Sequence, residues 1–206
     1  MKLTNFQYEL IKLDWVRNRC TAIYKKFPDI QGSDVLSNIF RSVLRETIIV
    51  QLHNFNQIRD KIIIDQTIAA VDKCLEPLWK PIDEYKDGIK RYRNNYIAHI
   101  QDKTKPFKET PEHIIERYSM PTYFGEWLFR AGCVMFYCQQ LEANFYKEWN
   151  KARKYYYASA PVPTKYGLLH LGTFKKELVM KLFQSIQNLK TSGYQYRDAR
   201  EKTKNE

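Results

Sequence analysis

The stretch IDEYKDGIKRYRNNYIAH, residues 82–99, carries the pattern on which the fold prediction rests. Apolar and aromatic residues recur in it every three or four positions, which places them on one stripe of an α-helix. A histidine falls on the same buried stripe, with arginines and asparagines beside it. The stripe consists of Ile82, Tyr85, Ile89, Tyr92, Tyr96 and His99. We therefore predict one helix from about Pro81 to Gln101, and we expect any chemistry of the chain to lie on it.

The polar residues of this helix form two groups. Arg93 follows Tyr92 by one position, so it lies about 100° round from the stripe. Arg91, Asn95 and His99 form a second row at a spacing of four residues. A straight helix separates Arg93 from His99 by about 240°, so these side chains meet within one chain only if the helix is distorted. An arginine and an amide beside a partly desolvated imidazole form a combination suited to a phosphate group.

The segment Arg93-Asn94-Asn95-Tyr96-Ile97-Ala98-His99 resembles the motif of the HEPN superfamily. In that motif an arginine followed by a polar residue, often asparagine, precedes a histidine by four to six positions. The Ala-His ending, followed by an aliphatic residue and Asp102, is most similar to the AbiU2-type branch, which is associated with abortive infection of phages. The resemblance covers about ten residues, and outside them it extends only to a general helical pattern.

The resemblance implies a metal-independent endoribonuclease of phage defence or of a toxin–antitoxin system, with RNA as its substrate and no cofactor. It assigns catalysis to Arg93, Asn94 and His99. The residues expected to bind RNA are Lys90, Arg91, Asn95 and Tyr96. The family usually dimerises, and known pairs suggest a nucleotidyltransferase-like antitoxin as a partner. We therefore expect a homodimer with the motif helix at or near its interface.

Two other interpretations remain open. One is a HEPN-like module that binds RNA or a partner protein through the same groove without cleaving it. The other is a purely structural dimer, in which His99 is a core histidine packed among Tyr92 and Tyr96. The sequence also leaves open whether Arg91 or Arg93 is the working arginine.

Composition bounds these interpretations. The chain has 206 residues, 44% of them hydrophobic, which suits one packed domain. We predict that this helical domain spans residues 1–190 and that residues 191–206, which are rich in charge and lack an apolar period, form a disordered tail. The net charge of +11 favours polyanionic partners such as RNA. No apolar run reaches the length of a membrane span, and the N-terminal residues do not resemble a signal peptide, so a cytoplasmic protein without membrane contact is expected.

Cysteines and histidines do not predict a metal site. The four cysteines, Cys20, Cys74, Cys133 and Cys138, are scattered among apolar residues, which suits buried reduced thiols. His53, His113 and His170 are isolated from other ligand-type residues at metal-binding spacings, so no zinc site is expected. No phosphate-binding glycine loop or nucleophile elbow is present in the sequence either.

The remaining patterns predict an all-α, up-and-down bundle of about six helices. The first helix runs from about Leu3 to Pro28. The second begins after an Asp34 cap and continues to about Phe55, with residues 56–64 as a connection. We expect its inward face to consist of Leu36, Ile39, Phe40, Val43, Leu44 and Ile48.

Further helices are predicted along the second half of the chain. Asp65 caps a third helix, and Thr110-Pro111 starts a short one. A single long helix follows from Phe124 to about Lys154, and a last helix carries Leu178, Leu182, Ile186 and Leu189. Tyr155-Tyr156-Tyr157, beside Lys151, Arg153 and Lys154, is either a surface that stacks bases or, as we prefer, a solvated helix end whose tyrosines cover the core.

Overall fold

The computed structural model describes residues 3–27, 32–97, 110–159 and 184. This part of the chain contains eight α-helices and one π-helical turn, and no β-strand, so the predicted all-α class is confirmed. The helices outnumber the predicted six because two long helices are each divided. The elements are α1 (Asn5–Lys26), α2 (Val35–Ile62), α3 (Gln66–Cys74), α4 (Glu76–Asp83), α5 (Lys86–Tyr92), the π-helical turn η2 (Arg93–Ile97), α6 (Pro111–Arg117), α7 (Phe124–Asn144) and α8 (Tyr146–Ser159).

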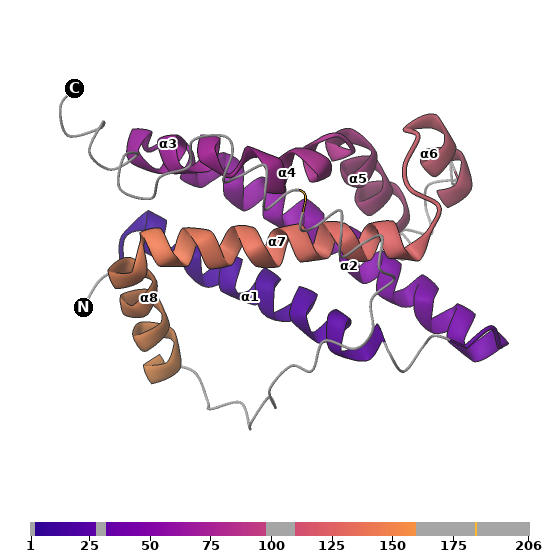
Figure 1. Cartoon of the computed structure of the whole chain (residues 1–206), viewed down its shortest axis with the longest axis horizontal. Helices are drawn as coiled ribbons and strands as arrows, with labels where there is room; N and C mark the ends of the chain where they lie inside the picture. Colours follow the sequence, from indigo (N-terminus) through magenta and orange to yellow (C-terminus); the bar gives the residue numbers. More distant parts are fainter. Residues whose placement is uncertain (1–2, 28–31, 98–109, 160–183, 185–206) are drawn as a thin grey trace, which may run out of the picture.

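The helices form one packed bundle (Figure 1). α1, α2 and α7 pack against one another at its centre, and α1 and α2 run antiparallel as expected. α4 packs on α7, while α5 and η2 pack on α2 and place the motif helix beside it. Apart from Gln184, the predicted last helix lies outside the described residues, and so does the charged tail, residues 191–206.

The predicted helix starts are confirmed by their caps. Thr4 and Gln7 form a reciprocal capping box at the start of α1. Asp34 accepts a hydrogen bond from the Ser37 N–H at 2.9 Å and begins α2. Asp65 does the same for α3, and Thr110 for α6. Local side-chain chemistry therefore fixes where these helices begin.

Two predictions about α2 were wrong. The helix does not end near Phe55 but continues to Ile62, because Ile58 and Ile62 extend its buried face. Its predicted inward face is exposed along the first half of the helix, where no described element packs on it. The exposed side chains are Val35 (75%), Leu36 (61%), Ile39 (54%), Phe40 (48%) and Val43 (52%).

The long helix predicted from Phe124 is also divided. α7 ends at Asn144, and Phe145 leaves the helical backbone conformation before α8 begins. The change of direction lets Arg153 of α8 reach Glu142 of α7 and Asp14 of α1. Arg17 joins them, at 2.5 Å from both carboxylates. Neither proline nor glycine marks the break, so this network explains it better than any local feature.

The approach to the motif differs from the predicted single helix. Pro81 lies inside α4, which ends at Asp83, and the chain leaves helical geometry at Tyr85 before α5 begins. Gly88 of α5 packs so closely that an added Cβ would lie 2.8 Å from Cβ of Tyr118. The glycine therefore allows α5 to approach the chain that follows α6.

A buried ion pair connects α2 to α3. Arg59 donates to Asp72 through Nε at 2.8 Å and Nη2 at 2.6 Å, and the Tyr137 hydroxyl donates to the same carboxylate at 2.7 Å. The guanidinium also lies over the Trp79 ring, 3.6 Å from its centroid. This network fixes the C-terminal half of α2, the helix on which α5 and η2 pack.

Candidate functional site

The motif begins where the α-helix changes into a π-helical turn. α5 ends at Tyr92, and Arg93–Ile97 form η2, in which hydrogen bonds span five residues instead of four. Such wide turns are rare and are often found at functional sites. The helix is therefore distorted at the motif. A distortion is required for the side chains of Arg93 and His99 to meet within one chain.

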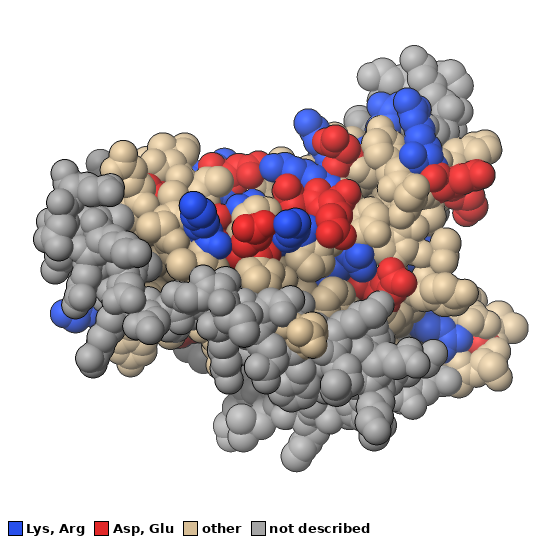
Figure 2. Space-filling view, turned by 45° about the horizontal axis from the view of Figure 1, so that its top comes forward, with Lys and Arg blue, Asp and Glu red and all other residues tan. Residues whose placement is uncertain are grey.

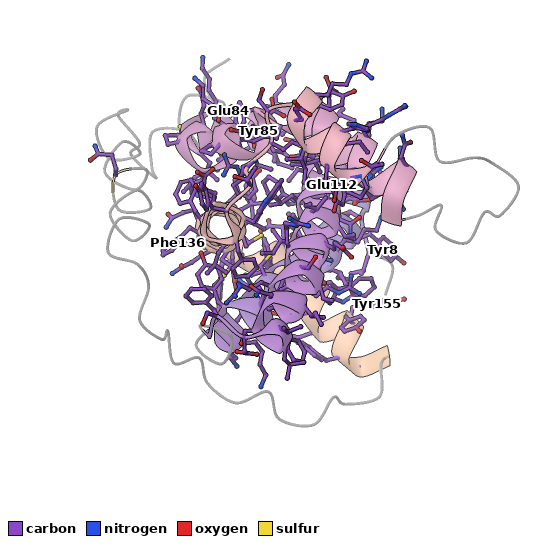
Figure 3. The ribbon with its side chains drawn as sticks, turned by 90° about the vertical axis from the view of Figure 1, so that its right-hand side faces the viewer. Tyr8, Glu84, Tyr85, Glu112, Phe136 and Tyr155 are labelled. Carbon is purple, nitrogen blue, oxygen red and sulfur yellow. The ribbon has the colours of Figure 1, made fainter. Side chains whose placement is uncertain are left out.

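The apolar stripe of the motif helix packs into the core as predicted. Ile82, Ile89 and Tyr92 are fully buried. Tyr85 is partly buried and lies under the guanidinium of Arg130, 4.5 Å from its ring centroid. Figure 3 shows Tyr85 beside Glu84 at the junction of α4 and α5. The stripe thus anchors one side of the helix and leaves its polar residues on the other sides.

The two motif arginines have separate amide partners. Arg93 is half-buried, and its Nη1 donates to Oδ1 of Asn94 at 3.0 Å. Arg91 is exposed and, with the side-chain oxygen of Asn95 turned towards it, donates to that oxygen through Nε at 2.8 Å and Nη2 at 3.2 Å. The predicted row of Arg91 and Asn95 is thus a real contact. Arg93 is the arginine that faces the interior.

His53 of α2 lies near enough to Arg93 for the guanidinium charge to act on its imidazole. It is 6% exposed, and the positive charges of Arg93 and Lys90 both act on it. An ion pair between Lys86 and Asp60, with a nitrogen–oxygen distance of 3.0 Å, joins the same two helices further along. Because residue numbers rise on α5 as they fall on α2, the two helices run antiparallel in this contact.

The surroundings of His53 favour its neutral form. Burial lowers the pKa of its imidazole below the usual value, and the charges of Arg93 and then Lys90 lower it further. A neutral imidazole has one nitrogen that accepts a proton. The site therefore combines a proton acceptor, a half-buried guanidinium and a carboxamide within one contact between α2, α5 and η2.

His53 was not predicted as a residue of this site. It was considered only as a zinc ligand, because no residue close to it in sequence suggested a site. The link to Arg93 depends on the register of α2 against α5, which periodicity does not specify. A buried polar face with both His53 and Asn56 on α2 was the available signal.

Two predicted site residues are not described. His99 lies outside the described residues, and so does the side chain of Tyr96, whose backbone belongs to η2. Lys90 is exposed on α5. The structure thus pairs Arg93 with Asn94 and Arg91 with Asn95, and it places Arg93 and Lys90 near enough to His53 for their charges to act on it.

The second basic and aromatic cluster is divided by the structure. Arg153 points into the ion-pair network with Asp14 and Glu142, so it has a structural role. Tyr155 and Tyr157 are exposed, at 37% and 48%. Lys147, Lys151 and Lys154 line a hollow of about 600 Å³ along α8, which is distant in sequence from the motif.

Surface charge and cysteine chemistry complete the description. The face shown in Figure 2 carries interspersed basic and acidic side chains rather than one continuous basic patch. Cys20, Cys133 and Cys138 are buried free thiols as predicted, whereas Cys74 is only partly buried. Burial raises the pKa of Cys133 and of Cys138 to about 12, which disfavours the reactive thiolate. Within the described ranges, no three Cys, His, Asp or Glu side chains cluster as metal ligands would.

Comparison with known proteins gives no further evidence about the function of the chain. No family model, no curated protein and no solved structure matches the chain. None of the helices in the described part has the length and apolar character needed to cross a membrane.

Proposed function

We propose that the protein is a metal-independent endoribonuclease with a HEPN-like, up-and-down helical fold, acting in phage defence or in a toxin–antitoxin system. The observation that carries the proposal is the hydrogen bond of Arg93 to Asn94 in a π-helical turn that packs on α2, where the charge of Arg93 acts on buried His53. The resemblance of residues 93–99 to the HEPN motif adds His99 to this set. The net charge of +11 is consistent with a polyanionic substrate.

The proposed reaction uses the nucleophile that RNA itself carries. An imidazole takes the proton of the ribose 2′-hydroxyl, and the 2′-oxygen forms a bond to phosphorus while the bond from phosphorus to the 5′-oxygen breaks. The departing 5′-oxygen receives a proton, which leaves a 2′,3′-cyclic phosphate and a 5′-hydroxyl. The resemblance assigns the proton transfers to His99, and His53 supplies a second imidazole to the same site.

Arg93 has the electrostatic role in this reaction. Negative charge accumulates on the phosphoryl oxygens in the transition state, and a preorganised cation stabilises it most strongly where water is partly excluded. Arg93 is half-buried, and its hydrogen bond to Asn94 fixes the orientation of the guanidinium. Exposed Arg91 and Lys90 are better suited to holding the flanking phosphates.

The test is cleavage of a single-stranded RNA by purified protein in EDTA, with product ends identified by mass spectrometry. We expect a 2′,3′-cyclic phosphate, loss of cleavage in His99→Ala, and no cleavage of DNA of the same sequence, which lacks the nucleophile. Cleavage that stops in EDTA would contradict the metal-independent mechanism. The second candidate, a non-catalytic binding module, is favoured by the low exposure of His53 and predicts RNA binding without any product.

The homodimer remains part of the proposal, and we assign it to the exposed apolar face of α2. Leu36, Ile39, Phe40 and Val43 form a stripe at helical spacing, and an exposed stripe of this kind is typical of an interface. Val43 lies ten residues before His53, about 15 Å along the helix axis, so a second copy on this face would lie near the site. Light scattering should give about twice the chain mass for the wild type and for Asn38→Glu. It should give the monomer mass for Ile39→Glu, whereas a wild-type monomer would contradict this assignment.

A further inference from the structure

A polar groove lies on α2 beside the face that packs on the motif helix. Its volume is about 230 Å³, and side chains of α1 and α2 line it. They include three basic side chains, an exposed indole and two carboxamides, which is an unusual set for the surface between two packed helices. The members used below are Glu9, Trp15, Arg19, Asn54, Gln57 and Lys61.

Two cations of this groove have no partner in the described part of the chain. Lys12 is paired with Glu9 at 2.7 Å, which leaves exposed Arg19 and Lys61 as the available charges. One comes from each helix, so they flank the groove. This arrangement suits the phosphates of a strand lying along the seam.

Trp15 provides an aromatic surface at the edge of the groove. Its side chain is 44% exposed, although its ring is held by an edge contact with Tyr156 of α8 at a centroid distance of 5.5 Å. Tyr8 of α1 and Tyr155 of α8 lie on the same side of the molecule (Figure 3). An exposed indole held in a fixed position is the feature on which an unpaired base stacks.

One acceptor in the groove has no donor in the described part of the chain. Oε2 of Glu9 is buried there without a hydrogen bond, while Oε1 holds Lys12. A buried acceptor of this kind is costly unless a ligand supplies a donor. The amino groups of unpaired bases are such donors, whereas a simple anion is not. Asn54 and Gln57 add carboxamides, which contact base edges.

Helix geometry places this groove next to the site of Arg93. Taking 100° per residue, Asn54 and Lys61 lie about 100° and 80° round α2 from His53, on the side of α1. Gln57 lies only about 40° from His53 and is exposed, so it forms the ridge between the two sites. A strand crossing this ridge passes from the groove to the side of α2 that carries His53, which lies near Arg93.

We infer that the groove between α1 and α2 binds single-stranded RNA next to the cleaved bond, with one base stacked on Trp15 and the adjoining phosphates held by Arg19 and Lys61. This inference rests on the proposed action on RNA, and it assigns the part of the molecule that holds the substrate strand. Glu9, Asn54 and Gln57 contact the sugar or the base edge.

The test is fluorescence anisotropy with a labelled ten-nucleotide RNA whose 2′-oxygens are methylated, so that it binds without being cleaved. Trp15→Ala should weaken binding roughly 5- to 150-fold, the range expected for loss of one stacked base. Arg19→Gln and Lys61→Gln should each reduce the slope of log K against log salt by about 0.7. Matched controls are Tyr123→Ala, an aromatic residue that is 76% exposed, and Lys73→Gln, an exposed lysine of α3, and both should bind like the wild type.

Intrinsic fluorescence gives a readout that does not depend on affinity. Trp127 and Trp149 are fully buried, and Trp79 is half-buried with Arg59 over its ring, so quenching by RNA in the wild type that disappears in Trp15→Phe would place the base on Trp15. Wild-type affinity in all three groove variants would overturn the inference. Binding of polyglutamate in preference to RNA would also overturn it and would indicate an acidic protein partner. If groove variants lose binding but the wild type cleaves no RNA, the ribonuclease proposal fails while the groove assignment holds.

Discussion

Loss of the Asp72 carboxylate charge should destabilise the bundle more than any exposed substitution. The side chains of Asp72 and Arg59 are 5% and 9% exposed, and the carboxylate accepts hydrogen bonds from Arg59 at 2.8 and 2.6 Å and from Tyr137 at 2.7 Å. Asp72→Asn keeps the shape of the side chain but leaves the guanidinium charge buried without a counter-ion. Removing one partner of such a pair costs about 3–5 kcal/mol.

Urea unfolding followed by circular dichroism measures this cost. The cycle consists of the wild type, Asp72→Asn, Arg59→Met and the double variant. We expect the double variant to be more stable than Asp72→Asn alone, with a coupling energy of about 2 kcal/mol or more, because removal of both charges leaves none uncompensated. A cost below about 1 kcal/mol for Asp72→Asn, or additivity within about 0.5 kcal/mol, would refute this reasoning. Asp60→Asn, in an exposed ion pair, is the control and should cost at most about 1 kcal/mol.

Three further outcomes are expected. Gly88→Ala should lower the free energy of unfolding by about 1–3 kcal/mol in the same urea assay, because the added methyl has no space, and an unchanged midpoint would contradict the close packing of α5. Burial opposes ionisation of Glu142, but its hydrogen bonds to arginines lower its pKa overall. The carboxylate therefore contributes its full stabilisation above the ordinary pKa of a glutamate, and this contribution is lost as the pH falls through the lowered pKa of Glu142. Melting temperatures of the wild type and Glu142→Gln should therefore differ at neutral pH and converge in acid, and a constant difference would contradict the lowered pKa. Lys90→Gln should raise the pKa of His53 in NMR titration, whereas Lys80→Gln, on α4, should leave it unchanged.

Local rules predicted the parts of the fold that depend on neighbouring residues. Asp34 and Asp65 cap helices because their side chains reach backbone N–H groups two or three residues away. The stripe from Ile82 to Tyr92 is buried because residues three and four apart share a helix face. Such features follow from sequence spacing alone.

Features that depend on distant contacts were not predicted. The pattern of Leu36, Ile39 and Phe40 correctly indicated a shared face, but periodicity does not specify whether another element covers that face. The break at Phe145 has no local cause, since it follows from the ion pairs that α8 makes. The pairing of His53 with the motif required the register of two helices, which only the packed structure provides.

The candidate site was predicted in part for the same reason. Arg93 and Asn94 were proposed because they are adjacent in a segment that resembles a known motif, and the structure shows a hydrogen bond between them. The choice between Arg91 and Arg93 was open in sequence. The structure distinguishes them by environment, since Arg91 is exposed and Arg93 is half-buried beside His53.

The central claim is that Arg93 and a histidine of the motif helix cleave RNA, and single-turnover cleavage with matched arginine variants tests it most directly. Arg93→Ala and His99→Ala should each lower the rate at saturating protein by about 10²- to 10⁴-fold, because one removes charge stabilisation and the other a proton transfer. Arg91→Ala should keep most of the saturated rate and mainly weaken binding. The account would be contradicted if Arg93→Ala weakened binding as much as Arg91→Ala does but left the saturated rate unchanged. It would also be contradicted if Arg91 were essential for cleavage and Arg93 dispensable.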